Sequence, residues 1–438
     1  MKHITIIGGG VAGVYFATKL IKEGFPGKNI TIIDKGKDPY QRKPEEVMCG
    51  YLGAGAWSDG KLVYLHNAIG GHLAKYCGEE KATSLVKEVV DYIKEFHPDP
   101  SKMMFSDPKI EPDFIKPYFN LRLAPTWHIG TNYLHEMGKR WFDWMVEQGV
   151  NFEWEKTINN IDFKDQTIIY EDGNMKQYDI LFYATGKSGI DLTQKIITDN
   201  RILTETKPVQ IGVRFEAPQK YFQKMVDISY DFKLYQKPND KVSLRSFCTN
   251  NFAAYIAEEE TYGMKSYNGH SYKEESKINN MTNFGIIMEI KNIDNPYEWA
   301  LDAVSKCQIN GKGVYYSPNG VRKPSLTSEG NLLDLHIIDE TEVITSLLND
   351  VYGEYSYYIW NYIRELNEVF QFKDDYGLYI PEVKFLSDEV LVNYEDLSLK
   401  QYPNVYFAGD SLSSRGIVVS GAQGLYIAES ILKKHINN

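Results

Sequence analysis

The chain has 438 residues, of which 43% are apolar and 24% charged, so we expect about two globular domains rather than a disordered, fibrous or miniature protein. Its 48 basic and 59 acidic residues give a net charge of −11, which argues against a broad binding face for duplex nucleic acid. The four cysteines, Cys49, Cys77, Cys248 and Cys307, form no CxxC pair. We therefore predict no metal site, no disulfide framework and a reducing, cytoplasmic location.

The amino terminus has the pattern of a strand, a glycine turn and a helix. Residues 3–7 are apolar and β-branched, Gly8, Gly10 and Gly13 follow with GxGxxG spacing, and residues 14–21 have helical periodicity. The apolar run 4–21 is too short and too rich in glycine for a membrane span, so we expect no membrane anchor. A second apolar strand at 30–33 ends at Asp34. This arrangement predicts a Rossmann-like dinucleotide site, in which the turn approaches a pyrophosphate and Asp34 accepts ribose hydroxyls.

Two later strands end in short signatures that separate FAD from NAD. Residues 178–186 end in Ala184, Thr185 and Gly186, and residues 404–410 end in Gly409 and Asp410, with a helix expected from Gly416 onward. Together with the glycine turn, they resemble the FAD-binding fold of the glutathione-reductase superfamily. The resemblance implies that Asp410 binds the ribityl hydroxyls of FAD. It also implies that the last helix points its amino end at the flavin pyrimidine ring, where negative charge builds up on reduction.

Further segments, in the same order along the chain, resemble a family of uncharacterised FAD-dependent dehydrogenases. They are residues 53–62, 128–131, 211–216, 245–248, 379–385 and 409–417. After Cys248, members of that family tend to carry a second cysteine and a Pro-Gly-Gly turn, where this chain has Thr249, Asn250 and Asn251. The departure affects the expected substrate pocket but not the expected cofactor.

The cofactor contacts expected from these patterns lie in the glycine turn, after the second strand, and at the two later strand ends. They are Gly8, Gly10, Val11, Ala12, Gly13, Asp34, Lys35, Gly55, Ser58, Lys61, Ile158, Ala184, Thr185, Gly186, Gly409, Asp410, Arg415, Gly416, Ile417 and Val418. Ser58, Asp59 and Lys61 could reach the flavin N5, its C4 carbonyl or the pyrophosphate. Alternatively, Ser58, Asp59 and Gly60 cap a following helix.

We predict an α/β fold, with a Rossmann-like FAD-binding domain from residues 1–195 and 372–438 and a β-rich α+β substrate or lid domain from 196–371. Only one dinucleotide fingerprint is present, so no separate NAD(P) domain is expected. Within the insertion we expect antiparallel strands at 209–215, 242–247, 252–256 and 283–290. We expect helices at 297–307 and 340–366, the second broken near 352–353, and a mobile polar loop at 268–280.

Candidates for chemistry are Arg245, His270, His128 and Lys61. An arginine on the inner face of a sheet normally needs an anionic partner, so Arg245 could bind a substrate carboxylate or phosphate as a fork, and His270 or His128 could take the proton. Each has a plainer interpretation: His128 as a structural hydrogen-bonding residue, His270 as a surface loop residue, and Arg245 as part of a protein ion pair. The same two alternatives hold for Arg214, and Cys248 is interpreted as a small buried apolar residue.

These observations favour an FAD-dependent oxidoreductase that transfers hydride between the flavin and a small organic substrate, such as an amine, an amino acid or an unsaturated acid. The electron acceptor or donor is left open. One alternative is an FAD-dependent enzyme that modifies tRNA or another nucleic acid, because residues 67–72 faintly echo a motif of such enzymes, although the acidic balance weighs against it. Another is a flavin-binding sensor without turnover.

Overall fold

The computed structural model describes residues 2–43, 46, 49–57, 60–67, 73–261, 263–272, 275–384, 388–412 and 414–435. The chain divides into two compact units. Unit 1 comprises residues 1–105, 124–206 and 386–438, and unit 2 comprises residues 106–123 and 207–385. A discontinuous unit thus carries a β-rich α+β unit as an insertion, and the expected α/β class is confirmed.

The observed domain boundaries differ from the expected ones. The first domain was expected to stop at 195 and to resume at 372, whereas unit 1 stops at 206 and resumes at 386. Strand β21 (Gly377–Lys384), which we had placed in the first domain, pairs with β13 and β19 of unit 2. Its eight residues are all buried, because it lies inside a large sheet. Residues 106–123 also belong to unit 2, where β5 (Asn120–Leu121) pairs with β14. The boundaries differ because strands from distant segments pair with each other, and the local composition of a segment does not indicate such pairing.

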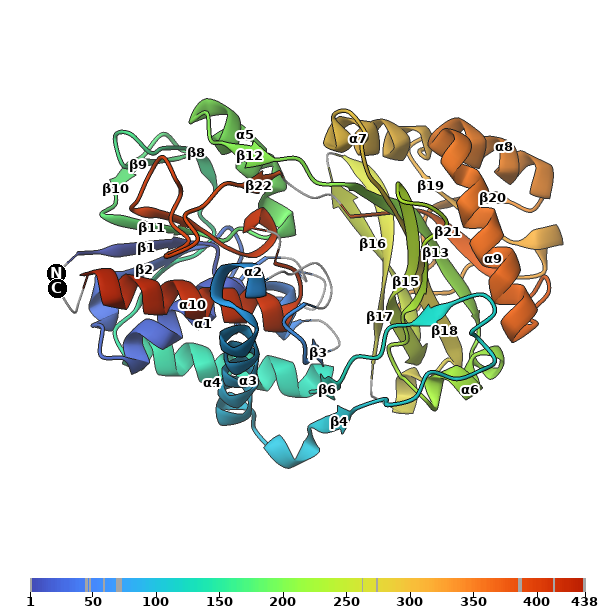
Figure 1. Ribbon diagram of the computed structural model, residues 1–438, viewed down its shortest axis with the longest axis horizontal. Coiled ribbons are helices and arrows are strands. Elements are labelled where there is room, and N and C mark those ends of the chain that lie inside the picture. Colours follow the sequence, from blue (N-terminus) through green and yellow to red (C-terminus); the bar gives the residue numbers. More distant parts are fainter. Residues whose placement is uncertain are drawn as a thin grey trace. The chain divides into compact units, whose positions relative to one another are not determined.

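Unit 1 is built on a parallel sheet in the order β23-β11-β1-β2-β7. Its strands are β1 (Ile4–Ile7), β2 (Ile30–Ile33), β7 (Asn151–Glu153), β11 (Ile180–Tyr183) and β23 (Val405–Phe407). All residues of β1, β2, β11 and β23 are buried, as is typical of parallel strands covered on both faces. Figure 1 shows helices along one side of this sheet and the small sheet β10-β9-β8 along the other.

The remaining elements of unit 1 cover the parallel sheet or extend its edges. Its helices are α1 (Val11–Lys22), α2 (Ala74–Cys77), α3 (Glu79–Phe96), α4 (Thr131–Glu147), α5 (Ile190–Asp199) and α10 (Ile417–His435). Its small sheets use β3 (Lys61–Val63), β4 (Met104–Ser106), β6 (Thr126–His128), β8 (Ile158–Asp162), β9 (Thr167–Tyr170), β10 (Met175–Gln177), β12 (Thr204–Glu205) and β22 (Glu389–Val390). The expected strand–turn–helix start and the two later strands are confirmed.

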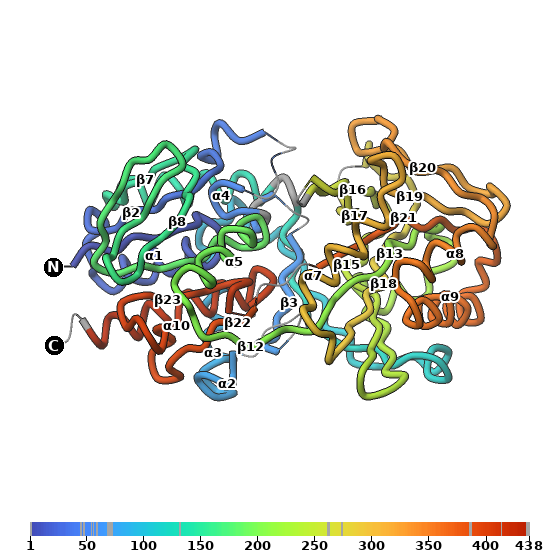
Figure 2. The backbone as a smooth tube through the Cα atoms, turned by 90° about the horizontal axis from the view of Figure 1, so that it is seen from above, coloured from blue at the N-terminus to red at the C-terminus, as the bar shows by residue number. Residues whose placement is uncertain are grey.

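Helices α1 and α10 pack side by side, although they lie at opposite ends of the sequence (Figure 2). A methyl group at Gly424 of α10 would lie 2.4 Å from the carbonyl oxygen of Ala12 in α1. The two helix backbones therefore approach each other more closely than any larger residue at 424 would permit. This packing ties the carboxyl-terminal strand and helix to the glycine turn.

Unit 2 contains an eight-stranded sheet in the order β20-β19-β21-β13-β18-β15-β14-β5. Its further strands are β13 (Val209–Pro218), β14 (Leu234–Gln236), β15 (Val242–Phe252), β18 (Met281–Ile290), β19 (Gly313–Tyr316) and β20 (Leu335–Ile338). Helices α6 (Gln223–Val226), α7 (Pro296–Lys306), α8 (Thr341–Tyr352) and α9 (Ser356–Phe370) and the hairpin of β16 (Ala254–Thr261) and β17 (Met264–Ser271) complete it. Figure 1 shows α8 and α9 on one side of this sheet and the hairpin on the other.

The two faces of this sheet differ in chemistry because side chains alternate along β13. Phe215 stacks on Phe284 of the neighbouring strand on the helix-covered face, while Arg214 and Glu216 lie on the opposite face. The expected helices and their break near 352–353 are confirmed as α7, α8 and α9. The loop expected at 268–280 is wrong in its first part, since residues 268–271 belong to β17 and pair with β16.

Candidate functional site

The glycines of the first turn have three different surroundings. Gly8 has φ +99°, and a Cβ there would lie 2.3 Å from the carbonyl oxygen of Ala184. A Cβ at Gly13 would lie 2.3 Å from the carbonyl oxygen of Gly8. A Cβ at Gly10 would meet no atom within 4 Å. Gly8 and Gly13 are therefore required by the fold itself, whereas Gly10 borders open space.

The first turn of α1 presents backbone N–H groups beside this open space. The first i to i−4 bond of the helix runs from the amide of Val14 to the carbonyl of Gly10, at 3.0 Å. The N–H groups of Val11, Ala12 and Gly13 precede that bond and have no partner of this kind within the helix. The amino-terminal residue Gly10 supplies no capping side chain, and no acidic residue lies in the first turn. Such a helix start attracts an anion, as a pyrophosphate is.

Asp34 follows β2 and organises the loop beside the glycine turn. Its Oδ2 accepts the amide of Gly9 at 2.8 Å, and its Oδ1 accepts the amides of Gly36 at 2.7 Å and Gly50 at 3.0 Å. A carboxylate oxygen can accept two hydrogen bonds, so Oδ2 keeps one lone pair for a ribose hydroxyl. The loop contacts at Oδ1 were not foreseen, because Gly50 lies in a segment without a recognisable pattern.

Arg42, which no sequence pattern marks, holds the loop that returns Gly50 to Asp34. The side chain is 6% exposed and donates to the carbonyls of Glu46 at 2.7 Å and Tyr51 at 2.9 Å. Its guanidinium lies 4.3 Å from the ring centroid of Trp57. Burial lowers the pKa of Arg42 to about 10. A lone arginine in a polar segment carries no signal of this role.

The end of β11 adjoins the end of β1 and adds a second open glycine. The amide of Ala184 donates to the carbonyl of Ile7 at 2.8 Å, which fixes the two strand ends together. Gly186 has φ +61°, and a Cβ there would meet no atom within 4 Å. Thr185 lies between them, with its hydroxyl 3.4 Å from that of Thr193.

Two other expected contacts have structural partners near this strand end. Lys35 Nζ donates to the carbonyl of Ser188 at 2.7 Å, which joins the end of β2 to the segment after β11. Ile158 is 8% exposed and packs in the hydrophobic core of unit 1.

The end of β23 contributes the third part of the site. Gly409 has φ +71° and Gly416 has φ +83°, and a Cβ at either would meet no atom within 4 Å. Asp410 lies between them and pairs with Arg415, whose Nε donates to Oδ1 at 2.8 Å. Ile417 and Val418 begin α10. A Cβ at Gly55 would lie 2.4 Å from Val11 Cγ2 and 3.6 Å from Ile417 Cγ1, so these three residues converge.

The topology explains why these segments meet. The strands run parallel, so their carboxyl ends share one edge of the sheet, and the chain order reverses between the neighbours β1 and β11. In open α/β sheets, ligands bind at this reversal point, outside the carboxyl ends of the strands. We call the open positions Gly10, Gly186, Gly409 and Gly416 the cradle.

Lys61 and His128 are brought together within unit 1. They lie directly opposite each other in the antiparallel pair of β3 and β6. His128 is 7% exposed. Gly60 leads into strand β3, so the alternative that residues 58–60 cap a helix is wrong. Ser58 and Asp59 lie outside the described residues.

Arg245 and His270 lie in unit 2 and already contact protein groups. Arg245 Nη2 donates to Gln210 Oε1 at 3.0 Å, and its Nη1 lies 3.8 Å from Glu289 Oε2. His270 is a strand residue of β17, opposite Tyr255, so its expected place on a loop is wrong. The rings of His270 and Tyr255 are nearly parallel, at 20°.

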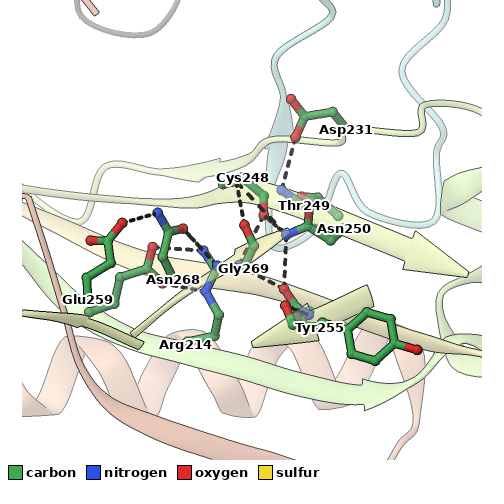
Figure 3. A network of polar contacts seen from close by, with 11 residues as sticks. Arg214, Asp231, Cys248, Thr249, Asn250, Tyr255, Glu259, Asn268 and Gly269 are labelled. Carbon is green, nitrogen blue, oxygen red and sulfur yellow. Dashed lines mark hydrogen bonds and ion pairs between the residues drawn. The ribbon is translucent and has the colours of Figure 1, made fainter. Parts of the chain in front are cut away.

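Arg214 is completely buried, and its anionic partner is the protein carboxylate of Glu382. Its Nε and Nη2 donate to the two carboxylate oxygens at 2.9 Å and 2.8 Å. Figure 3 shows its contacts with Cys248, whose carbonyl accepts at 3.1 Å, and with the side chain of Asn268, which accepts at 3.0 Å. Arg214 also donates to the side chain of Asn283 at 2.9 Å. Burial opposes its charge, but Glu382 raises the pKa of Arg214 above its ordinary value. The network joins the β16–β17 hairpin to the sheet, so Arg214 is structural.

The described residues contain neither a metal-binding cluster nor a membrane-spanning helix. Within those ranges, no three His, Cys, Asp or Glu side chains lie close enough to hold a metal ion. No helix in the described part of the chain is both long and apolar enough to cross a membrane.

No protein-family model matches the sequence, and no curated protein matches it. Among solved structures, the fold is similar to L-proline dehydrogenase from P. horikoshii (13% identity, 99% of this chain, 94% of that chain, TM-score 0.41). It is also similar to a flavoprotein/dehydrogenase from Cytophaga hutchinsonii (12%, 99%, 79%, 0.40) and to tetracycline destructase Tet(51) (11%, 100%, 83%, 0.39). At such identities and TM-scores, any assignment depends on the residues of the chain itself, and membership of the FAD-dependent dehydrogenase family stays a prediction.

Proposed function

We propose that this protein is an FAD-dependent oxidoreductase. The observation that carries the proposal is the open space at Gly10 beside the N–H groups of the first turn of α1, which have no partner within the helix, at the point where the strand order reverses. A pyrophosphate requires this combination of close backbone approach and positive helix dipole. The third strand end, with Gly409 and Asp410, is typical of the FAD-binding superfamily that the sequence resembles. It therefore favours FAD over NAD as the cofactor.

The residues of unit 1 fit the parts of FAD in order. Val11, Ala12 and Gly13 would bind the pyrophosphate through their amides, and Oδ2 of Asp34 would accept a ribose hydroxyl. Asp410 would accept ribityl hydroxyls. The amino end of α10, after Gly416, would supply N–H donors to the pyrimidine side of the flavin. These amides favour negative charge at that end of the ring and so raise its reduction potential.

FAD, when bound, accepts or donates a hydride at N5. We propose a small organic substrate such as an amine, an amino acid or an unsaturated acid. Arg245, whose side chain is 21% exposed, would bind its carboxylate as a fork. His270, His128 or Lys61 would take or return the proton that accompanies hydride transfer.

The test of the cofactor is direct. The purified protein should be yellow, and heating followed by chromatography should release FAD. Release of FMN or NAD, or of no nucleotide, would contradict the proposal. Anaerobic stopped-flow measurement of the bound flavin against amines, amino acids, 2-hydroxy acids and NAD(P)H then identifies the substrate class. NAD(P)H should reduce the flavin slowly and without saturation at micromolar concentration, because only one dinucleotide fingerprint is present.

A further inference from the structure

The loop between β23 and α10 is held from two sides. On one side, Gln423 of α10 is completely buried, and its Oε1 accepts the amide of Gly409 at 2.8 Å while its Nε2 donates to the carbonyl of Leu412 at 3.3 Å. The amide of Ser414 also donates to the carbonyl of Gly409 at 2.9 Å. These bonds fix the backbone around Asp410 without any contribution from Arg415.

On the other side, the guanidinium of Arg415 holds the carboxylate of Asp410. Its Nε lies 2.8 Å from Oδ1 and its Nη2 lies 3.4 Å from Oδ2, a two-point contact in fork geometry. The two side chains are 18% and 15% exposed, so the pair is largely sheltered from water. A two-point contact fixes the rotation of the carboxylate as well as its position, which a single hydrogen bond does not.

The carboxylate keeps acceptor capacity after this pairing. A carboxylate offers about four lone-pair sites, and Arg415 uses one at each oxygen. Gly409, which directly precedes Asp410, and Gly416 both border open space, so Asp410 lies between two open positions of the chain and can accept further hydrogen bonds.

We propose that Arg415 is a positioning residue, which acts on the cofactor through Asp410 by fixing the carboxylate that receives the ribityl hydroxyls. This inference rests on the proposed function. It assigns Arg415 a role different from direct cofactor contact, in which its guanidinium would bind the flavin or a phosphate itself.

The experiment is a double-mutant cycle on FAD affinity, measured by titrating the apo protein with FAD and following flavin fluorescence. Arg415→Met and Asp410→Asn should each weaken FAD binding by about tenfold, the usual effect of losing one hydrogen bond to a charged group. Because both act on one interaction, the double variant should bind FAD no more weakly than Asp410→Asn alone. Arg415→Lys, which keeps the charge but loses the two-point contact, should recover only part of the affinity.

The matched control is Arg140→Met, which removes an exposed pair with Glu136 on α4 and should leave FAD affinity unchanged. Circular dichroism melting of each apo variant checks that the fold is kept. If Arg415→Met weakened FAD binding equally in the unmodified protein and in the Asp410→Asn variant, Arg415 would contact FAD directly, and the inference would be overturned. Unchanged or tighter binding by Arg415→Met, or equal affinity of the Lys and Met variants, would also overturn it. Failure of the unmodified protein to bind FAD would instead refute the proposed function.

Discussion

Gly10 is the position at which cofactor binding and folding can be separated by one methyl group. A Cβ at Gly10 meets no protein atom within 4 Å, so Gly10→Ala should fold. Its cost to the apo protein is the poorer helix capping of alanine, about 1 kcal/mol or less. The same methyl group occupies the space that a pyrophosphate needs in order to reach the N–H groups of α1.

The expected loss of affinity follows from overpacking, which costs about 1–3 kcal/mol, or roughly 5- to 150-fold in the dissociation constant of FAD. Gly10→Val, with two further carbons, should abolish measurable binding. The assay is titration of the apo variants with FAD, next to thermal unfolding of the same samples.

Two neighbouring glycines provide the controls for this prediction. A Cβ at Gly9 would make ordinary contacts, 3.4 Å from Asp34 Oδ2 and 3.5 Å from Trp154, so Gly9→Ala should retain FAD affinity. A Cβ at Gly13 would lie 2.3 Å from a backbone oxygen, so Gly13→Ala should destabilise the apo protein. If Gly10→Ala bound FAD as tightly as the unmodified protein, the assignment of the open space to a pyrophosphate would be refuted.

Two further predictions concern the buried charges of unit 2. Arg214→Met leaves the carboxylate of Glu382 buried and unpaired, so chemical denaturation should show a loss of about 3–5 kcal/mol. The comparison variant Arg245→Met removes a pair whose side chains are 21% and 23% exposed and should lose about 1 kcal/mol or less, and equal losses would refute the distinction. Burial raises the pKa of Glu216, so its contribution to stability is complete below its unfolded pKa of 4.5 and is lost as the pH rises through the folded pKa. Glu216→Gln should therefore have the same free energy of unfolding as the unmodified protein at low pH. Above pH 4.5 it should become the more stable of the two, by about 1.4 kcal/mol per pH unit, until a plateau is reached at the folded pKa. Thermal melting of both proteins across pH measures this difference, and a difference that does not change with pH would contradict the prediction.

Sequence patterns predicted the elements whose structure depends on interactions between residues that are close together in the chain. The turn from Gly8 to Gly13 was predictable because its glycines serve steric needs within a few residues of one another, and the apolar strands because both of their faces are buried. Strand β17 was not, since polar residues such as Asn268 and His270 occupy it. They are accommodated there by strand pairing and, for Asn268, by the hydrogen bond from Arg214.

The candidate site was predictable to the same extent. The sequence placed Asp34 and Asp410 at the right strand ends, but it could not indicate which partners their carboxylates would have. Gln423 resembles any polar residue in a helix until its two hydrogen bonds to the preceding loop are seen. Arg214 and Glu382 are 168 residues apart, and neither carries a local sign of the other.

The side-by-side packing of α1 and α10 has a consequence for how the protein is made. As the chain leaves the ribosome, β1 and α1 emerge early, but their neighbours β23 and α10 emerge only after all of unit 2. Most of unit 2 is one continuous segment and can fold during synthesis, whereas the parallel sheet of unit 1 stays incomplete until β23 and α10 have emerged. We therefore expect a nascent chain halted before β23 to expose the hydrophobic edge of β11, to bind no nucleotide, and to be a preferred client of molecular chaperones.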